Sequence, residues 1–138
     1  MDMSSFYQEH ADLAVIVTRL KGHIAKPITG SGELAAVIAG DLTQLSTKLN
    51  LHLGKEDLYL YPRLLKSAGP EKALAEAFQK EMGGLKEAYG AFKTRWGNAQ
   101  SIAAEPDVFI RDAKAVIQAL ETRIKRENTE LYKAAEKI

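Results

Sequence analysis

Two stretches of the chain repeat one another: HLGKEDLYLY at residues 52–61 and RIKRENTELY at residues 123–132. Each stretch has a nitrogen-bearing side chain followed four residues later by a carboxylate: His52 and Glu56, then Arg123 and Glu127. Four residues make about one turn of an α-helix, so the two members of each pair share one helix face. Both stretches have the pattern of a helix end with an acidic and aromatic tail. The repeat indicates that one metal-binding half-site was kept and that a second was rebuilt around a guanidinium group.

Outward from these stretches, apolar residues recur at helical spacing along almost the whole chain, and the alternation typical of β-strands is never sustained. The predicted fold class is therefore all-α. Ser4 and Ser5 can cap the first predicted helix. The inward-facing stripes of the four predicted helices are Phe6, His10, Leu13, Val17, Leu20 and Ile24; Ile38, Leu42, Leu45, Leu49, His52, Glu56 and Tyr59; Leu74, Phe78, Met82, Leu85, Tyr89, Phe92 and Trp96; and Phe109, Ala113, Val116, Leu120, Arg123, Glu127 and Leu131.

Proline and glycine mark the breaks between these helices. Residues 26–32 contain a proline and two glycines and predict the first connection. Pro62 ends or kinks the second helix, and the glycine pair at 83–84 weakens the third. Residues 97–106 are small and polar and predict a surface loop. Four amphipathic helices with short connections predict an antiparallel up-down-up-down four-helix bundle.

The length and composition limit the classes of protein that fit. A chain of 138 residues predicts one domain, residues 1–138, with a core of its own. The formal net charge of +1, from 19 basic and 18 acidic residues, gives no field that favours nucleic acid or a membrane as partner. Cysteine is absent, which excludes disulfides and thiolate metal sites. No signal peptide or membrane-spanning run is recognisable, so we expect a soluble cytoplasmic protein.

Five ionisable residues occupy stripe positions where an apolar residue is expected. In an up-down-up-down bundle they fall at the same end and at about the same level: His10, His52, Glu56, Arg123 and Glu127. Burying such groups costs free energy unless they are paired, hydrogen-bonded or bound to a metal. The pattern therefore predicts one compensated polar layer in the core.

This arrangement resembles the hemerythrin-like, or HHE cation-binding, family over essentially the whole chain. The residues that carry the resemblance are Glu9-His10, 52–57 with 60–62, and 127–128 with 130–132. The resemblance implies a four-helix bundle with two bridged irons, histidine ligands from all four helices and two bridging carboxylates. On this basis, His10 and His52 would hold one iron, and Glu56 and Glu127 would be the bridges.

For the other iron, the resemblance places the three ligands at Phe78, Met82 and Arg123, where no histidine is present. Phenylalanine has no donor atom, a thioether is a poor ligand for a hard ferric ion, and a guanidinium does not give up its proton. An ordinary di-iron oxygen carrier is therefore not expected.

Two interpretations of the remaining half-site stay open. In the first, the bundle is metal-free or only opportunistically occupied, and Arg123 pairs with Glu56 and Glu127. In the second, the two carboxylates together with His10 and His52 bind one divalent ion, for which Fe(II), Mn(II), Zn(II) and Co(II) all suit the donor set and iron is the first choice. The sequence favours the metal-free interpretation, because Arg123 is already in the chain whereas a metal must be recruited.

The two interpretations predict different roles. A metal-free bundle is expected to act as an interaction or regulatory module, as a homodimer or with another protein partner. A mononuclear module is expected, from the family resemblance, to sense or handle oxygen, nitric oxide, peroxide or iron, with a small gaseous ligand only when metal is bound. Neither interpretation predicts an enzyme.

The remaining histidine and the aromatic residues have simpler expected roles. His23 lies thirteen residues after His10, or about 20 Å along an ideal helix, so these two histidines cannot share an ion. We expect His23 to lie at the surface or to cap the helix. Plain core packing that closes the site is expected for Met82, Phe78, Tyr89, Phe92 and Trp96.

Overall fold

The helices of the structure follow the apolar stripes of the sequence. The computed structural model describes residues 1–29 and 32–138, and all regular elements in this part of the chain are helical. Gly30 and Ser31, which belong to the connection predicted at 26–32, lie outside the described residues. The α-helices are α1 (Ser4–Ile24), α2 (Glu33–Lys55), α3 (Tyr61–Leu65), α4 (Pro70–Met82), α5 (Leu85–Trp96), α6 (Ala99–Ala104), α7 (Pro106–Arg126) and α8 (Tyr132–Ala135), and the π-helical turns are η1 (Glu56–Leu60) and η2 (Glu127–Leu131).

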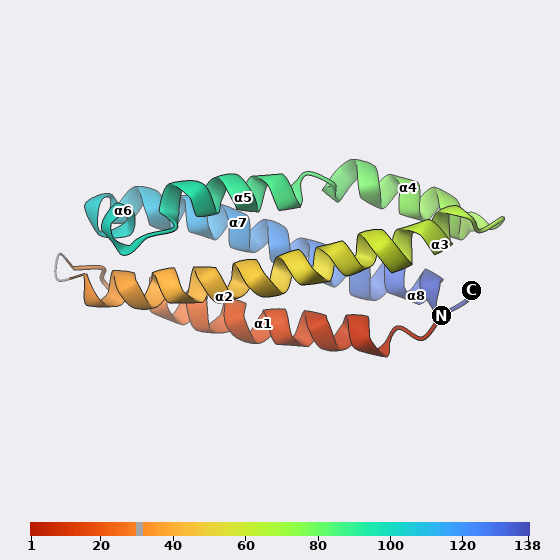
Figure 1. Cartoon of the computed structure of the whole chain (residues 1–138), viewed down its shortest axis with the longest axis horizontal. Helices are drawn as coiled ribbons and strands as arrows, with labels where there is room; N and C mark the ends of the chain where they lie inside the picture. The colour runs from red at the N-terminus through yellow and green to blue at the C-terminus, as the bar shows by residue number, and fades with distance from the viewer. Residues whose placement is uncertain (30–31) are drawn as a thin grey trace.

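The long helices run alternately in opposite directions (Figure 1). Helix α1 runs away from the end of the bundle where the chain begins, α2 returns to it, α4 and α5 run away again, and α7 returns. The termini lie side by side at this end, where the Met1 ammonium donates to the Ala135 carbonyl oxygen at 3.1 Å. The predicted all-α up-down-up-down bundle is confirmed. None of the helices in the described part of the chain is both long and apolar enough to cross a bilayer.

The third rod of the bundle is divided at Gly83 and Gly84. Helix α4 ends before this pair and α5 begins after it. A Cβ atom at Gly83 would lie 2.5 Å from the backbone oxygen of Gln79, so another residue would force the backbone to shift. The local weakness predicted for the third helix is therefore a complete break.

Two predicted helix boundaries are wrong. Residues 97–106 are not a plain loop, because they contain α6, which begins where the Asn98 side chain accepts a hydrogen bond from the Ser101 backbone N–H at 2.8 Å. The serines at the start of α1 do not cap it. Instead, the Asp2 carboxylate accepts from the Ser4 backbone N–H at 2.9 Å, so the capping oxygen comes from a residue before the helix.

The inner face of two helices differs from the predicted stripe. Tyr59 was expected inside but is 62% exposed, whereas Leu60 and Tyr61 are buried. The reason is η1, because a π-helical turn holds more residues than an α-helical one and moves the inward face along the sequence. In α7, Val116 is only partly buried, and its neighbour Ile117 is the residue that enters the core.

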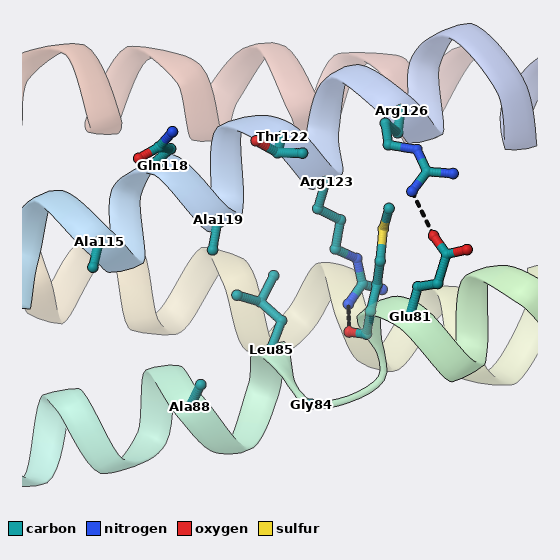
Figure 2. Close-up of a pocket in the computed structure, with 11 residues that line it drawn as sticks. Glu81, Gly84, Leu85, Ala88, Ala115, Gln118, Ala119, Thr122, Arg123 and Arg126 are labelled. Carbon is teal, nitrogen blue, oxygen red and sulfur yellow. Dashed lines mark hydrogen bonds and ion pairs between the residues drawn. The ribbon is translucent and has the colours of Figure 1, made fainter.

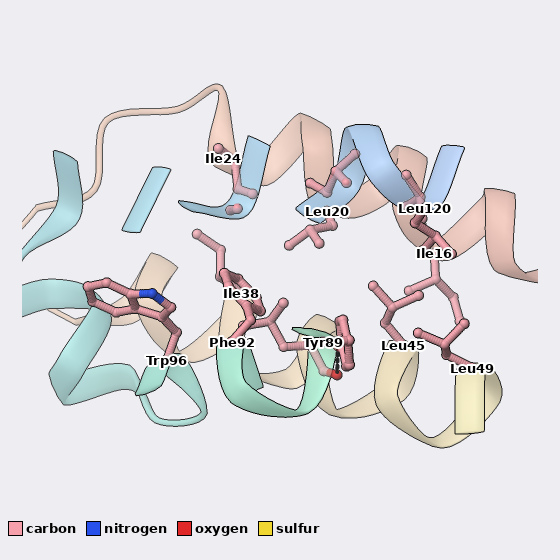
Figure 3. Packing of buried hydrophobic residues seen from close by; sticks show 14 of the residues in the cluster. Ile16, Leu20, Ile24, Ile38, Leu45, Leu49, Tyr89, Phe92, Trp96 and Leu120 are labelled. Carbon is pink, nitrogen blue, oxygen red and sulfur yellow. Dashed lines mark hydrogen bonds between the residues drawn. The ribbon is translucent and has the colours of Figure 1, made fainter. Parts of the chain in front are cut away.

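Buried apolar side chains form two clusters. The larger cluster fills the bundle from its middle to the end away from the termini, with Leu45, Tyr89 and Trp96 among its members (Figure 3). The smaller cluster lies at the end with the termini and includes Phe6 and Leu131. The clusters are separated by a buried group that we call the polar layer: His10, His52, Glu56, Arg123 and Glu127.

Candidate metal centre

Four members of the polar layer form a group that can hold a metal ion. One ligand atom from each of His10, His52, Glu56 and Glu127 lies within 4.8 Å of the other three, and all four residues are buried. His10 comes from α1, His52 from the end of α2, and each glutamate is the first residue of a π-helical turn. The residues that the sequence analysis assigned to one half-site are thus brought together by the fold.

The two histidines are oriented by acceptors outside the group. His10 Nδ1 lies 2.6 Å from the Asn128 side-chain oxygen, and His52 Nδ1 lies 2.7 Å from a Glu9 carboxylate oxygen. Glu9 is itself held by Lys55 Nζ at 2.8 Å. An amide oxygen and a carboxylate can only accept, so each Nδ1 carries a proton. Both Nε2 atoms therefore point into the layer, and each carries a lone pair when its ring is neutral.

Tyr132 is a member of the centre that the sequence analysis missed. Its hydroxyl donates to Glu56 Oε2 at 2.6 Å and lies 3.0 Å from His10 Nε2 and 3.1 Å from His52 Nε2. The ring is fully buried. A signal was available in the repeat, because both stretches place a Leu-Tyr pair at the same distance after the glutamate.

Arg123 joins the two carboxylates on their other side. Its Nε donates to Glu127 Oε2 at 3.1 Å and its Nη2 donates to Glu56 Oε1 at 3.2 Å. Its Nη1 donates to the backbone oxygen of Met82 at 3.0 Å. The guanidinium therefore bridges the carboxylates in the way expected of a charge-compensating residue.

The other two positions matched to lost iron ligands lie on the same side of the layer. Phe78 is fully buried and lines a small cavity of about 250 Å³ together with Arg123. Met82 is partly buried, and the atom it presents to Arg123 is its backbone oxygen. Phe78 and Met82 thus both lie near the Arg123 side chain, and its guanidinium occupies this side of the layer.

Burial and neighbouring charge determine protonation in the layer. Burial raises the pKa of Glu127 and the charge of Glu56 adds to the increase. Burial also opposes ionisation of Glu56, but hydrogen bonding and charge from His52, with the charge of Arg123, lower its pKa. For His52, burial disfavours the charged ring, but the carboxylates of Glu56 and Glu9 outweigh burial and raise its pKa. The layer therefore favours ionised Glu56 and protonated His52 when no metal is bound.

The centre of the layer has more acceptors than donors. Tyr132 has a single proton, which it donates to Glu56. Glu127 Oε1 lies 3.1 Å from His10 Nε2, and no other side chain in the described part of the chain donates to that oxygen. With neutral histidines, lone pairs would face lone pairs across these contacts. The centre therefore requires added positive charge, either as protons on its side chains or as a metal ion.

A surface cleft reaches Arg123 from outside the bundle (Figure 2). The cleft has a volume of about 660 Å³ and runs between α7 and the break that separates α4 from α5. Leu85, Ala88 and Ala119 give it an apolar wall, and the Arg126–Glu81 ion pair lies at its edge. Solvent thus approaches the polar layer from the side of the guanidinium.

The third histidine lies away from this centre. His23 Nδ1 contacts a carboxylate oxygen of buried Asp41, and Arg19 Nε donates to the other oxygen at 3.0 Å. The His23 side chain is 22% exposed, so the residue lies partly at the surface, but its partner is a buried carboxylate on α2 and not a helix end. His23 ties α1 to α2 at the opposite end of α1 from His10.

The fold and the buried group together define a helical bundle with a histidine–carboxylate centre. The family model described as hemerythrin HHE cation binding domain matches residues 2–135, and the chain belongs to this family. Neither the curated proteins nor the solved structures gave a match to the chain. The cation binding named in the family description agrees with the buried group of possible ligands.

The bridging contacts of Arg123 predict a large contribution to stability. We expect Arg123→Ala to lower the free energy of unfolding of the metal-free protein by about 3–5 kcal/mol, because two buried carboxylates lose their counter-ion. The loss should shrink at acid pH as the carboxylates become protonated. Urea denaturation followed by circular dichroism measures both effects.

The matched control for this experiment is Arg111→Ala, at a position on α7 whose side chain is 74% exposed. The control should leave the free energy of unfolding nearly unchanged. A loss under about half a kcal/mol for Arg123→Ala would contradict the bridging role.

Proposed function

We propose that this chain is a hemerythrin-like module that binds one metal ion through His10, His52, Glu56 and Glu127. The observation that carries the proposal is the orientation of the histidines. Each Nδ1 is held by an outer acceptor, and each Nε2 faces the carboxylates. Histidines that ligate metals are commonly oriented in this way by an outer hydrogen bond.

The donor set decides which ions fit. Two imidazole nitrogens and two carboxylates suit Fe(II), Mn(II), Zn(II) or Co(II), and family membership makes iron the first choice. Ligand atoms about 2.1 Å from an ion are at most about 4.2 Å apart. The group spans up to 4.8 Å, so it would contract by about 0.6 Å at its widest on binding.

We propose that Arg123 takes the place of a second metal ion. Its guanidinium already binds one oxygen of each carboxylate, which leaves the other oxygen of each facing the histidines. The neighbouring Phe78 and Met82 side chains supply no hard ligand. The site is thus degenerate with respect to a di-iron centre, with one half retained and the other replaced by a fixed cation.

The biological role that we propose is to sense or handle oxygen, nitric oxide, peroxide or iron, as a binding module and not as an enzyme. A bound redox-active ion would supply an open coordination position for such a small ligand. The cleft brings small molecules as far as Arg123, whose guanidinium contacts both carboxylates of the proposed site. The apolar wall of the cleft suits uncharged diatomic molecules.

A second candidate is a metal-free interaction module, as a homodimer or with another protein. It is supported by the hydrogen bonding of the layer, since no buried side-chain nitrogen or oxygen in the described residues lacks a partner. Protons on the histidines, together with Arg123, would then supply the positive charge. The exposed apolar side chains of Leu51, Leu58 and Tyr59 offer a surface for such an interaction.

Metal stoichiometry separates these candidates. After anaerobic loading with Fe(II) and removal of the excess, we expect about one ion per chain by mass spectrometry. His10→Ala and His52→Ala should each reduce binding to well below that level, because each removes a nitrogen ligand. His23→Ala is the matched control and should retain the ion. The proposed site would be contradicted if all three variants lost iron alike, or if the parent protein held no iron after loading.

The degenerate half predicts a gain of function. Replacing Phe78, Met82 and Arg123 together by histidine restores three imidazole ligands and removes the guanidinium, so we expect about two ions per chain. The matched control is the double variant Phe78→His with Met82→His, which keeps Arg123 and should remain at about one. If the folded triple variant also holds only one ion, this region has been repacked and no longer accommodates a metal.

The raised pKa of His52 predicts how metal stabilisation depends on pH. In the metal-free protein, the stability from protonated His52 is fully present below about pH 6.5 and is lost as pH rises through the folded-state pKa. A metal ion displaces that proton, so the stability gained on adding Zn(II) should increase with pH over this range. Thermal unfolding with and without Zn(II) at several pH values measures the gain. An equal gain at every pH would speak against proton–metal competition at His52.

A further inference from the structure

The hydroxyl of Tyr132 lies among the atoms that the proposed function assigns to the metal. It is 3.0 Å from His10 Nε2, 3.1 Å from His52 Nε2 and 2.6 Å from Glu56 Oε2. We propose that Tyr132 is a fifth metal ligand, which binds a ferric ion through its phenolate oxygen. This inference rests on the proposed mononuclear site and adds a ligand and an oxidation state to it.

With neutral histidines, hydrogen bonding does not account for the position of this oxygen. The single Tyr132 proton is donated to Glu56, which is the shortest of the three contacts. Toward His10 and His52 the hydroxyl can only accept, yet both Nε2 atoms carry lone pairs when the rings are neutral. With neutral rings, three lone-pair donors thus converge from three side chains, an arrangement that either a proton on His52 or a metal ion stabilises.

The distances also fit neighbouring ligands of one ion. Ligand atoms about 2.1 Å from an ion and at right angles to one another are about 3.0 Å apart. The contacts of the Tyr132 oxygen with the two nitrogens have this length, as does the 3.1 Å contact between His10 Nε2 and Glu127 Oε1. The oxygen therefore lies where an additional ligand would be, beside the histidines.

The Tyr132 ring is held in this position. It stacks on the His10 ring with a centroid distance of 4.8 Å and an angle of 15°. Phe6 and Tyr7 pack edge-on against Tyr132 at 5.8 and 5.3 Å. These contacts hold the phenol oxygen beside both Nε2 atoms.

The charge of the resulting site favours the ferric state. Two carboxylates and a phenolate give three negative charges, and Arg123 compensates one of them. A trivalent ion is attracted to this set more strongly than a divalent one, and hard anionic oxygens suit it. On binding, the phenol O–H bond breaks, the proton is released to solvent, and the oxygen electron pair forms the bond to iron. No electron is transferred in this step.

The chain contains a matched control for this ligand. Tyr61 occupies the equivalent position in the other repeat and is also buried. In the described part of the chain, its hydroxyl forms no hydrogen bond to the four proposed ligands of the parent site. Tyr61→Phe thus removes a tyrosine hydroxyl near the layer without removing the proposed ligand.

The test is to load the protein with ferric ion, supplied as its nitrilotriacetate complex, and to record the visible spectrum and the iron content. A ferric phenolate gives a phenolate-to-iron charge-transfer band and tyrosinate modes in resonance Raman spectra. We expect both in the parent protein and in Tyr61→Phe. We expect Tyr132→Phe to lose both and to bind iron at least tenfold more weakly.

Different failures have different meanings in this test. Iron bound without the charge-transfer band, or a band that persists in Tyr132→Phe, would overturn the fifth ligand while leaving the mononuclear site intact. Absence of bound iron from the parent protein would overturn the proposed function as well. If Tyr132→Phe does not fold, tyrosinate modes in both the parent protein and Tyr61→Phe still show that a phenolate other than that of Tyr61 binds the iron.

Discussion

The ion pairs between one guanidinium and two buried carboxylates are the constraint on which the structure depends. Glu56 and Glu127 are 0% and 1% exposed, and Arg123 donates to both. Two carboxylates so placed repel one another and resist ionisation unless a cation lies between them. Arg123 provides that cation on one side, and the histidines face the remaining oxygens. The polar layer can therefore divide the apolar core into two clusters without leaving an uncompensated charge.

The layer has an approximate internal symmetry that follows the sequence repeat. Each glutamate begins a π-helical turn, and each turn is followed by a buried tyrosine. The equivalent pairs are His52 with Arg123, Glu56 with Glu127, and Tyr61 with Tyr132. The first pair breaks the symmetry, because an imidazole can give up a proton and coordinate an ion whereas a guanidinium cannot. One half of the layer is thus suited to a metal, and the other carries a permanent charge.

Much of the fold is predictable from the sequence because burial selects apolar residues at helical spacing. The stripes in α1 and α2 were visible in this way, whereas the pair Gly83 and Gly84 predicted a local weakness where the structure has a break. Tyr59 was misplaced and Tyr132 was missed for one physical reason: a 3.6-residue period contains no information about where a π-helical turn begins. The short helix α6 was missed because six residues carry too little periodicity to distinguish a helix from a loop.

The candidate site was predictable in its members but not in its surroundings. Ionisable residues in apolar stripes predict a buried layer, but the stripes do not identify the groups that orient it. Glu9 and Asn128 each stand next to a layer residue in sequence, yet their hydrogen bonds to the histidines depend on how the helices pack. These contacts turn both Nε2 atoms inward. They therefore favour the mononuclear metal site over the metal-free bundle that the sequence alone favoured. Arg123 explains why a single ion, and not a pair, is proposed.

Anomalous diffraction from crystals of the Zn(II)-loaded protein would test this description of the centre most directly. We expect one peak per chain, bounded by His10 Nε2, His52 Nε2 and the carboxylates, with Arg123 still bound to Glu56 and Glu127. Two peaks, a peak on the Arg123 side, or no peak under conditions that saturate other zinc sites would contradict a mononuclear centre in which a guanidinium replaces the second metal.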